Sequence, residues 1–478
     1  MKYIFTNCSL KYELELMCCH FFPNEKPTEE DDGCGVIEVV RENDRYRVKI
    51  EKNGKIGEAF ESFSDCAEPL EQKRRESKAF KTAFWHAARK VTDISVPWGI
   101  LTGIRPSKPI EALLTEHGEQ RTREILGDEF FTEESRISLG IAAAKRTLLA
   151  KKEMYKNGVS IYVGIPFCPS RCRYCSFVSH SIATAGALLP DYLKKLEEEI
   201  YKKGEIVKNL GLLPETLYIG GGTPAVISEY DIKSLFEALD GAFSLKNFRE
   251  ITFEAGRPDC ITGEKAAALY SVSPEMRISV NPQSLNDGVL EKIGRNHTAE
   301  DFYRALYTVR EAGLLNINSD VIAGLSGDSL ESFEKTVNAL INENIPSITV
   351  HTLSKKRAAT EGKSDVSASE TEKMVDFSRN ALTEKGFLPY YLYRQRNIGA
   401  NLENVGYAKA GGECLYNIYM MEDIQTVLAC GAGSVSKLKT KGNTVREANY
   451  KFPYEYLRNP HKENEVFYNV LSDGKLTF

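Results

Sequence analysis

The chain has 478 residues, of which 42% are hydrophobic and 27% are charged, and its formal net charge is -5. This length allows two or three domains whose cores need no disulfides. The charge gives no indication of nucleic acid or an acidic membrane surface as a partner. No apolar run approaches the roughly 18 residues that suggest a membrane span.

The amino-terminal segment does not resemble a signal peptide, because Asn7, Lys11, Glu13 and Glu15 interrupt any apolar core. We therefore expect a cytoplasmic protein. Its 11 cysteines should then stay reduced, and clustered cysteines are best interpreted as metal ligands or catalytic thiols.

Residues 1–155 are predicted to form an α+β domain. Alternating apolar residues indicate strands near 3–7, 35–40 and 46–55, the last ending in an Asn-Gly turn signal. Amphipathic helices are expected over about 68–91 and 133–152.

Residues 156–365 change to a regular alternation of strands and helices. Six strands are predicted, in the segments SIYVGIP, TLYIGG, EITFEA, RISVNPQ, NINSDVIAGL and SITVHTL. Repeated βα units predict a parallel sheet with helices outside, here an α/β fold of the partial (β/α)6 TIM-barrel type. Residues 366–478 are expected to form a small C-terminal extension that begins with a helix near 367–386. Functional groups of such folds lie on loops after the carboxyl ends of strands.

The first predicted barrel strand is followed by PFCPSRCRYCSF, in which Cys168, Cys172 and Cys175 have the spacing C-x-x-x-C-x-x-C. One loop of this length can surround one corner of a [4Fe–4S] cluster, whose preferred ligands are thiolates. Three cysteines leave the fourth iron open, as a substrate-activating centre requires. The alternative is three buried free cysteines, which is hard to reconcile with their spacing directly after a strand.

Further motifs follow the other predicted strands. LYIGGGTP places Gly220, Gly221, Gly222 and Thr223 after the second strand, where backbone can approach a ligand closely. TFEAGRPD ends the third strand at Glu254, a hydrogen-bond acceptor. Each motif alone is also compatible with an ordinary tight turn or a solvated rim residue.

The order of these motifs resembles the radical S-adenosylmethionine (SAM) superfamily. Within it, roughly residues 160–440 resemble the oxygen-independent coproporphyrinogen III dehydrogenase family. The layout of the whole chain, with WGILTGIRPSKP in the N-terminal domain and PYYLYRQRN near the end, looks most similar to the HemZ-like branch. The resemblance implies two cofactors, a [4Fe–4S] cluster held by the three cysteines and SAM bound beside it. In such enzymes an electron from the cluster cleaves SAM to a 5′-deoxyadenosyl radical.

The resemblance also implies individual SAM contacts. Tyr162, Glu254 and Arg295 are expected to act in catalysis as well as in binding, with Arg295 paired to a SAM carboxylate through its planar fork. The remaining expected contacts are Tyr174, Gly221, Gly222, Thr223, Gln283, Asp320, Ser354 and Val435. Asn281-Pro282 departs from relatives, which usually have Gly-Val there.

The family reaction is oxidative decarboxylation of two propionates of coproporphyrinogen III to vinyl groups, giving protoporphyrinogen IX. The expected partner is therefore a tetrapyrrole, with an unidentified electron donor and acceptor. Candidate anchors for the propionates are Arg171, Arg173, Arg394, Arg396 and Lys409.

Two other functions stay open at this stage. A heme chaperone of the same family would carry H-N-x-x-Y-W, but this chain has Tyr416 in place of the histidine and Met421 in place of the tryptophan. Tyr416 and Met420 are nevertheless conceivable heme ligands. A radical SAM enzyme that methylates and opens heme would use the same cofactor site. Phe177 stands where catalytic dehydrogenases often have a fourth cysteine.

Overall fold

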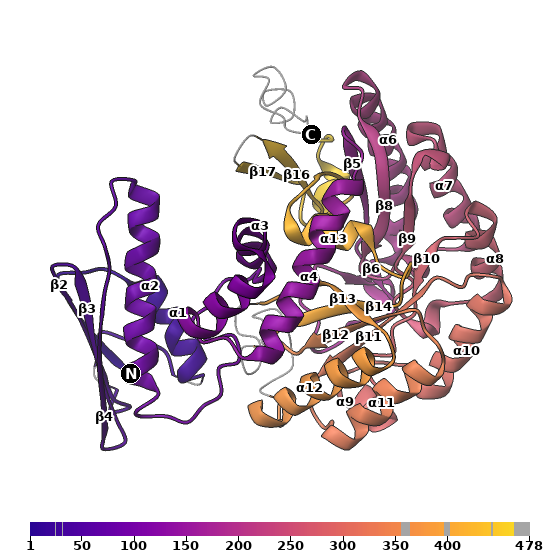
Figure 1. The fold of residues 1–478 in the computed structure, drawn as a ribbon. Coiled ribbons are helices and arrows are strands. Elements are labelled where there is room, and N and C mark those ends of the chain that lie inside the picture. Colours follow the sequence, from indigo (N-terminus) through magenta and orange to yellow (C-terminus); the bar gives the residue numbers. More distant parts are fainter. Residues whose placement is uncertain (24, 31, 355–363, 396–401, 441–442, 463–478) are drawn as a thin grey trace. The chain divides into compact units, whose positions relative to one another are not determined.

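The structure is a computed structural model, and it describes residues 1–23, 25–30, 32–354, 364–395, 402–440 and 443–462. The chain divides into two compact units, coloured along the sequence in Figure 1. The first contains Met1–Ile141 and Arg394–Glu403, and the second contains Ala142–Tyr393 and Asn404–Phe478. The division falls within helix α4 (Glu134–Glu153). A separate C-terminal extension from residue 366 stays a prediction.

The first unit is built on a four-stranded sheet of order β1-β2-β3-β4, in which β1 is parallel to β2 and the other pairs are antiparallel. Its strands are β1 (Lys2–Thr6), β2 (Val36–Glu42), β3 (Arg45–Lys52) and β4 (Lys55–Ser62). Asn53 and Gly54 both have positive φ, 50° and 76°, as the predicted Asn-Gly hairpin turn requires. The predicted helix 68–91 is α2 (Pro69–Ala88). Helix α1 (Lys11–Phe21) was not predicted.

The core of the first unit lies between this sheet and its helices. Leu14 and Phe21 of α1, Val48 of β3 and Phe84 of α2 are fully buried there. Each such side chain contributes about 1.5–3 kcal/mol when it leaves water. Two helical segments follow, α3 (Ser107–Glu124) and the π-helix η1 (Ile125–Glu129).

The returning segment of the first unit is held by Glu403. Its carboxylate accepts a hydrogen bond from Trp98 Nε1 at 2.7 Å and pairs with Arg136 at 3.1 Å. Both charged side chains are buried, so each depends on the other for compensation.

The second unit contains an eleven-stranded sheet of order β13-β14-β12-β11-β10-β9-β8-β5-β15-β16-β17. The six predicted barrel strands are confirmed as parallel neighbours. They are β5 (Gly158–Ile165), β8 (Leu213–Gly221), β9 (Glu250–Phe253), β10 (Arg277–Ser279), β11 (Ile317–Ala323) and β12 (Ser347–Thr352). β5 is buried along nearly its whole length, as expected for a strand covered on both faces.

Five further strands extend this sheet at its two ends. A seventh parallel strand, β15 (Thr426–Cys430), pairs with β5 and was not predicted. Antiparallel strands follow outward on each side: β14 (Asn404–Ala408) and β13 (Leu388–Tyr393) beyond β12, and β16 (Val435–Thr440) and β17 (Asn443–Ala448) beyond β15. Among the described residues no pairing joins β13 to β17, so the barrel is partial.

Helices connect the parallel strands, and Figure 1 shows α6, α7, α8, α10 and α11 succeeding one another along one side of the sheet. The connecting helices are α5 (Ile182–Ala185), α6 (Leu189–Asn209), α7 (Glu229–Phe243), α8 (Gly263–Val272), α9 (Asp287–Lys292), α10 (Ala299–Glu311), α11 (Leu330–Asn342) and α12 (Ala368–Glu384). Their starts follow from local sequence: Ser228 with Asp231 and Thr298 with Asp301 form capping boxes at α7 and α10.

Two helices follow β14 in the chain, α13 (Leu415–Glu422) and α14 (Pro453–Arg458). The Glu250 carboxylate, at the amino end of β9, accepts the backbone N–H groups of Leu415 at 2.6 Å and Tyr416 at 3.0 Å. Helix α13 therefore begins at the amino ends of the barrel strands, opposite to the predicted site. In the part of the chain that is described, no helix is both long and apolar enough to cross a membrane.

Candidate functional site

The three predicted cluster cysteines lie on the loop that follows β5. Cys168 ends the short strand β6 (Phe167–Cys168), which pairs with β7 (His180–Ser181). Cys172 is 9% exposed, and a backbone hydrogen bond from Cys175 to Cys172 closes the turn between them. Among the described residues no three ligand side chains converge as they would on a single metal ion. Thiolates of a cubane stand farther apart than that, because irons and sulfides lie between them.

The glycine loop after β8 is fastened to the cysteine loop by its backbone. Gly222 N–H donates to Ile165 O at 2.9 Å and Thr223 N–H donates to Phe167 O at 2.8 Å. The Thr223 hydroxyl lies 3.6 Å from Cys168 Sγ. A Cβ added at Gly222 would stand 2.8 Å from that sulfur, so only glycine leaves the thiolate its space.

Arg295 holds the other side of the cysteine loop. Its Nη1 donates to Asn281 O at 2.9 Å, and its Nη2 donates to the Tyr174 hydroxyl at 3.1 Å. The side chain is buried, and its Nε has no hydrogen-bond partner among the described residues. A buried guanidinium N–H without a partner is costly unless a ligand supplies an acceptor.

Gln283 presents a second buried polar atom of this kind. Its backbone has φ of 66°, which non-glycine residues seldom adopt, and is fixed on β11 by hydrogen bonds to Asp320 O and from Ile322 N–H. Its side-chain Oε1 is buried without a partner in the described structure. The predicted pair Gln283 and Arg295 thus carries unused hydrogen-bonding capacity.

Glu254 follows β9 and is tied to an aromatic group inside the barrel. The Tyr218 hydroxyl donates to its Oε1 at 2.6 Å. Tyr218 stacks on Tyr416 with centroids 4.5 Å apart, and Tyr162 lies 6.2 Å from both rings. Burial raises the pKa of Glu254 to about 7, while the hydrogen bond from Tyr218 opposes that rise.

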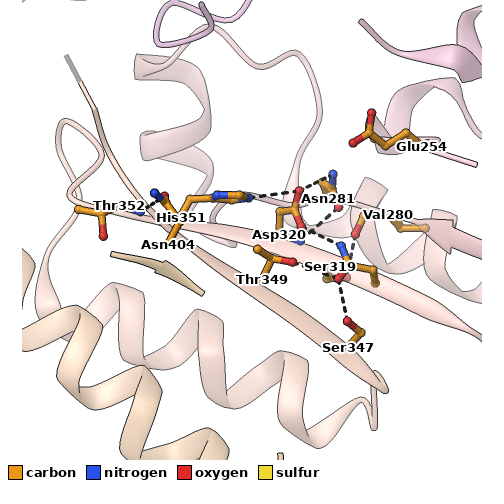
Figure 2. Close-up of polar contacts among 12 residues, drawn as sticks. Glu254, Val280, Asn281, Ser319, Asp320, Ser347, Thr349, His351, Thr352 and Asn404 are labelled. Atoms are coloured by element: carbon orange, nitrogen blue, oxygen red, sulfur yellow. Dashed lines mark hydrogen bonds and ion pairs between the residues drawn. The ribbon is translucent and has the colours of Figure 1, made fainter. Parts of the chain in front are cut away.

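Asp320 on β11 is occupied by protein partners (Figure 2). Its carboxylate accepts from the Asn318 amide at 2.8 Å and the Asn281 amide at 3.0 Å, and His351 Nε2 lies 3.6 Å away. Although burial alone would raise its pKa, His351 and Asn318 hold the pKa of Asp320 below its usual value. Asn281, the departure from the family pattern, also accepts the Asp320 backbone N–H at 3.1 Å.

The last two predicted SAM contacts lie at the edges of the site. Ser354 is partly buried just after β12, and Val435 is the first residue of β16 and is 38% exposed. The loop before Val435 is held from helix α6. The Tyr192 hydroxyl accepts Ala432 N–H at 2.9 Å, and Glu199 accepts Gly431 N–H at 2.8 Å.

The predicted propionate anchors are dispersed. Arg171 and Arg173 are exposed on the cysteine loop, and Arg173 Nη1 donates to Lys292 O at 2.9 Å. Arg394 belongs to the first unit, where it is buried against Leu101 and His20. Lys409 follows β14, which runs antiparallel to β12, and so it lies at the amino end of that strand. Arg396 lies outside the described residues.

Sequence reasoning missed Arg257. This buried side chain forms a two-fold pair with Asp259 at 2.9 Å, and its Nη1 lies 3.6 Å from Cys172 Sγ. A cation at this distance stabilises a thiolate. Its position three residues after Glu254, in AGRPD, was the available signal.

Comparisons with known proteins identify the family. The model of the Radical SAM superfamily matches residues 162–340. The oxygen-independent coproporphyrinogen-III oxidase-like protein HemZ of Bacillus subtilis is 39% identical over 376 residues, covering 76% of this chain and 75% of that protein. The heme chaperone HemW of Lactococcus lactis is 32% identical over 200 residues, covering 42% of this chain and 50% of that protein.

A solved structure described as coproporphyrinogen III oxidase (HemN) from Escherichia coli also matches. Its TM-score is 0.49 at 21% identity, over 70% of this chain and 73% of that chain, so the fold here is argued from the strand order instead.

This chain is a radical SAM enzyme and belongs to the HemZ-like family of oxygen-independent coproporphyrinogen-III oxidase-like proteins. Membership of the superfamily implies a [4Fe–4S] cluster and SAM. The residues present fit both groups. Three cysteine side chains lie on one loop with a glycine cradle and a neighbouring guanidinium, and two buried polar atoms have no hydrogen-bond partner among the described residues.

Proposed function

We propose that this protein converts two propionate side chains of coproporphyrinogen III to vinyl groups, giving protoporphyrinogen IX. The name of the Bacillus subtilis relative supports this substrate class. The observation that carries the proposal is the assembly at the carboxyl ends of the strands. The cysteine loop, the glycine loop and Arg295 are joined there by hydrogen bonds, and within the described residues the Nε of Arg295 and the Oε1 of Gln283 have no partner.

Each conversion removes a hydrogen atom, carbon dioxide and one electron from a propionate. When bound, the cluster and SAM supply a radical able to abstract that hydrogen atom. The chain's own residues bind and orient. Cys168, Cys172 and Cys175 would hold the cluster, and Arg295 would pair with the SAM carboxylate through its free Nε and an adjacent Nη.

Other residues at the carboxyl ends of the strands would contact SAM or surround it. Glu254, kept in place by Tyr218, would accept hydrogen bonds from the ammonium or the ribose of SAM. The rings of Tyr162, Tyr218 and Tyr416 stack on one another next to this carboxylate. Gln283 would contribute its unused Oε1 to ribose hydroxyls.

The alternative function, a heme-binding carrier, has less support. Tyr416 is only 5% exposed and is held in the ring stack with Tyr218. The sulfur of Met420 lies 2.8 Å from Lys437 Nζ. Both conceivable heme ligands are therefore engaged inside the second unit. A heme-opening enzyme would use the same cofactor residues. Turnover with coproporphyrinogen III distinguishes the two activities.

The test is turnover under strict anaerobiosis. The protein is reconstituted with iron and sulfide, then supplied with reductant, SAM and coproporphyrinogen III, and products are followed by mass spectrometry. We expect 5′-deoxyadenosine together with stepwise loss of two carboxyl groups. Cleavage of SAM with untouched porphyrinogen would overturn the substrate assignment and make heme the next substrate to test. Heme binding without SAM cleavage would favour the carrier.

A further inference from the structure

His351 lies near the carboxyl end of β12. Successive inward side chains of a strand are two residues apart, and here they are Ser347, Thr349 and His351. The hydroxyls of Ser347 and Thr349 donate to Asn318 Oδ1 at 3.0 and 3.2 Å, so these side chains share one face of the sheet with Asn318 of β11. Those two residues are buried, whereas the His351 side chain is 25% exposed at the carboxyl end of the strand.

The imidazole is oriented by Asp320. Figure 2 shows the ring of His351 directed at the Asp320 carboxylate, with Nε2 at 3.6 Å from Oδ2. Asn404 accepts the backbone N–H of the next residue, Thr352, at 3.0 Å and so fixes the end of the strand. Because Nε2 faces this carboxylate, Nδ1 is the ring nitrogen left to meet a ligand.

Asp320 has little capacity left for a ligand of its own. A carboxylate has about four acceptor sites, and Asn281, Asn318 and His351 already face three of them. The Asp320 carboxylate, 19% exposed, therefore faces protein groups, whereas the His351 side chain, 25% exposed, keeps one ring nitrogen without a hydrogen-bond partner at the carboxyl end of β12 in the described structure.

We propose that His351, oriented by Asp320, binds a carboxylate of the tetrapyrrole substrate at the mouth of the barrel. This inference rests on the proposed function, because propionates are the carboxylates concerned. Among the described anchors of the second unit, Arg171 and Arg173 lie on the cysteine loop, and Lys409 lies at the amino end of β12 rather than its carboxyl end. A donor on β12 would face the substrate from across the sheet, since β5 and β8 carry the cysteine and glycine loops.

The experiment measures porphyrin binding by fluorescence in the reconstituted protein with SAM present. The probes are coproporphyrin III, the stable oxidised form of the substrate, and its tetramethyl ester, which keeps the ring but lacks the negative charges. The variants are His351→Gln and His351→Lys. The matched control is His461→Gln, because His461 also faces a carboxylate, that of Glu198 at 3.4 Å.

We expect wild type and His461→Gln to prefer the acid over the ester, and His351→Gln to lose about tenfold of that preference, the size of one charge-assisted hydrogen bond. His351→Lys should regain part of it. Cluster content and SAM affinity should not change, which shows that the variants are folded. An acid preference kept in His351→Gln would overturn the inference alone. Equal binding of acid and ester by the wild type would overturn the proposed substrate and the inference together.

Discussion

The polar residues near β5, β8 and β9 (the first wall of the barrel) and those near β11 and β12 (the second wall) differ in how far their hydrogen-bonding groups are satisfied. On the wall of β5, β8 and β9, the cysteine loop packs against Arg295, whose Nε is buried without a partner in the described structure. On the wall of β11 and β12, the Asp320 carboxylate faces Asn281, Asn318 and His351. Both walls end in residues that match the family's SAM contacts.

The difference separates residues held ready for a ligand from residues engaged with one another. An unpartnered buried donor costs free energy until a ligand arrives, whereas a satisfied network stabilises the fold whether or not a ligand is present. Changes on the first wall should therefore affect the cofactors, and changes on the second should affect stability or substrate binding.

The largest expected effect is at the cysteine loop. Cys168→Ala removes one thiolate ligand, so it should abolish both the visible absorbance of the cluster and the formation of 5′-deoxyadenosine. Iron content and a chromatographic assay of the nucleoside measure these. Cys34→Ala, at an exposed cysteine of the first unit, is the control and should leave both unchanged. Persistent SAM cleavage by Cys168→Ala would contradict the assignment.

Arg295→Lys should weaken SAM binding about tenfold or more, because lysine keeps the charge but loses the planar fork. The cluster should remain, as measured by absorbance, while the SAM dissociation constant is measured by calorimetry. Arg304→Lys on the exposed side of α10 serves as control. Unchanged SAM affinity in Arg295→Lys would place the SAM carboxylate elsewhere.

A change at the Asp320 network near β11 and β12 should lower the stability of the protein. Asn281→Ala removes the amide that both donates to the Asp320 carboxylate and accepts its backbone N–H. We expect the free energy of unfolding to fall by about 1–3 kcal/mol in a denaturant titration, with SAM affinity nearly unchanged. Asn247→Ala, at an exposed site, should change stability much less. A large loss of SAM affinity with full stability would reverse the contrast between the two walls.

The smallest expected effect is a shift in a pH profile. Burial raises the pKa of Glu254 to about 7, so SAM affinity should increase as the pH rises through that value and the carboxylate ionises. Tyr218→Phe removes a hydrogen bond that favours the ionised form, and the midpoint should move up by about one pH unit. Tyr230→Phe, on the surface, should leave it in place. An identical midpoint in Tyr218→Phe would mean that Glu254 does not control this profile.

Much of the fold followed from the sequence because the signals were local. Apolar strands and amphipathic helices alternate along the second unit, and caps such as Ser228 mark helix starts. The strand β15 was missed, because the short run Thr426–Cys430 becomes a barrel strand only by pairing with the distant β5. The helix α1 was missed because its apolar and polar residues are weakly segregated.

The sequence predicts which motifs meet at the candidate site, but it does not predict which of their side chains form hydrogen bonds with one another. Motifs at the ends of parallel strands had to share one edge, which brought Cys168 and Thr223 together. The Tyr218–Glu254 and Asn281–Asp320 hydrogen bonds depend on strand register, which single motifs do not specify. The sequence does not show that β14 runs antiparallel to β12, which places the predicted anchor Lys409 at the amino end of that strand.

The most direct test of the account uses coproporphyrinogen III deuterated on the propionate carbon next to the ring. It is incubated anaerobically with the reconstituted protein, SAM and reductant. The masses of 5′-deoxyadenosine and of the porphyrinogen product are then measured by mass spectrometry. The account predicts one deuterium in 5′-deoxyadenosine for each vinyl group formed. Deuterium-free 5′-deoxyadenosine beside an unaltered porphyrinogen would contradict it.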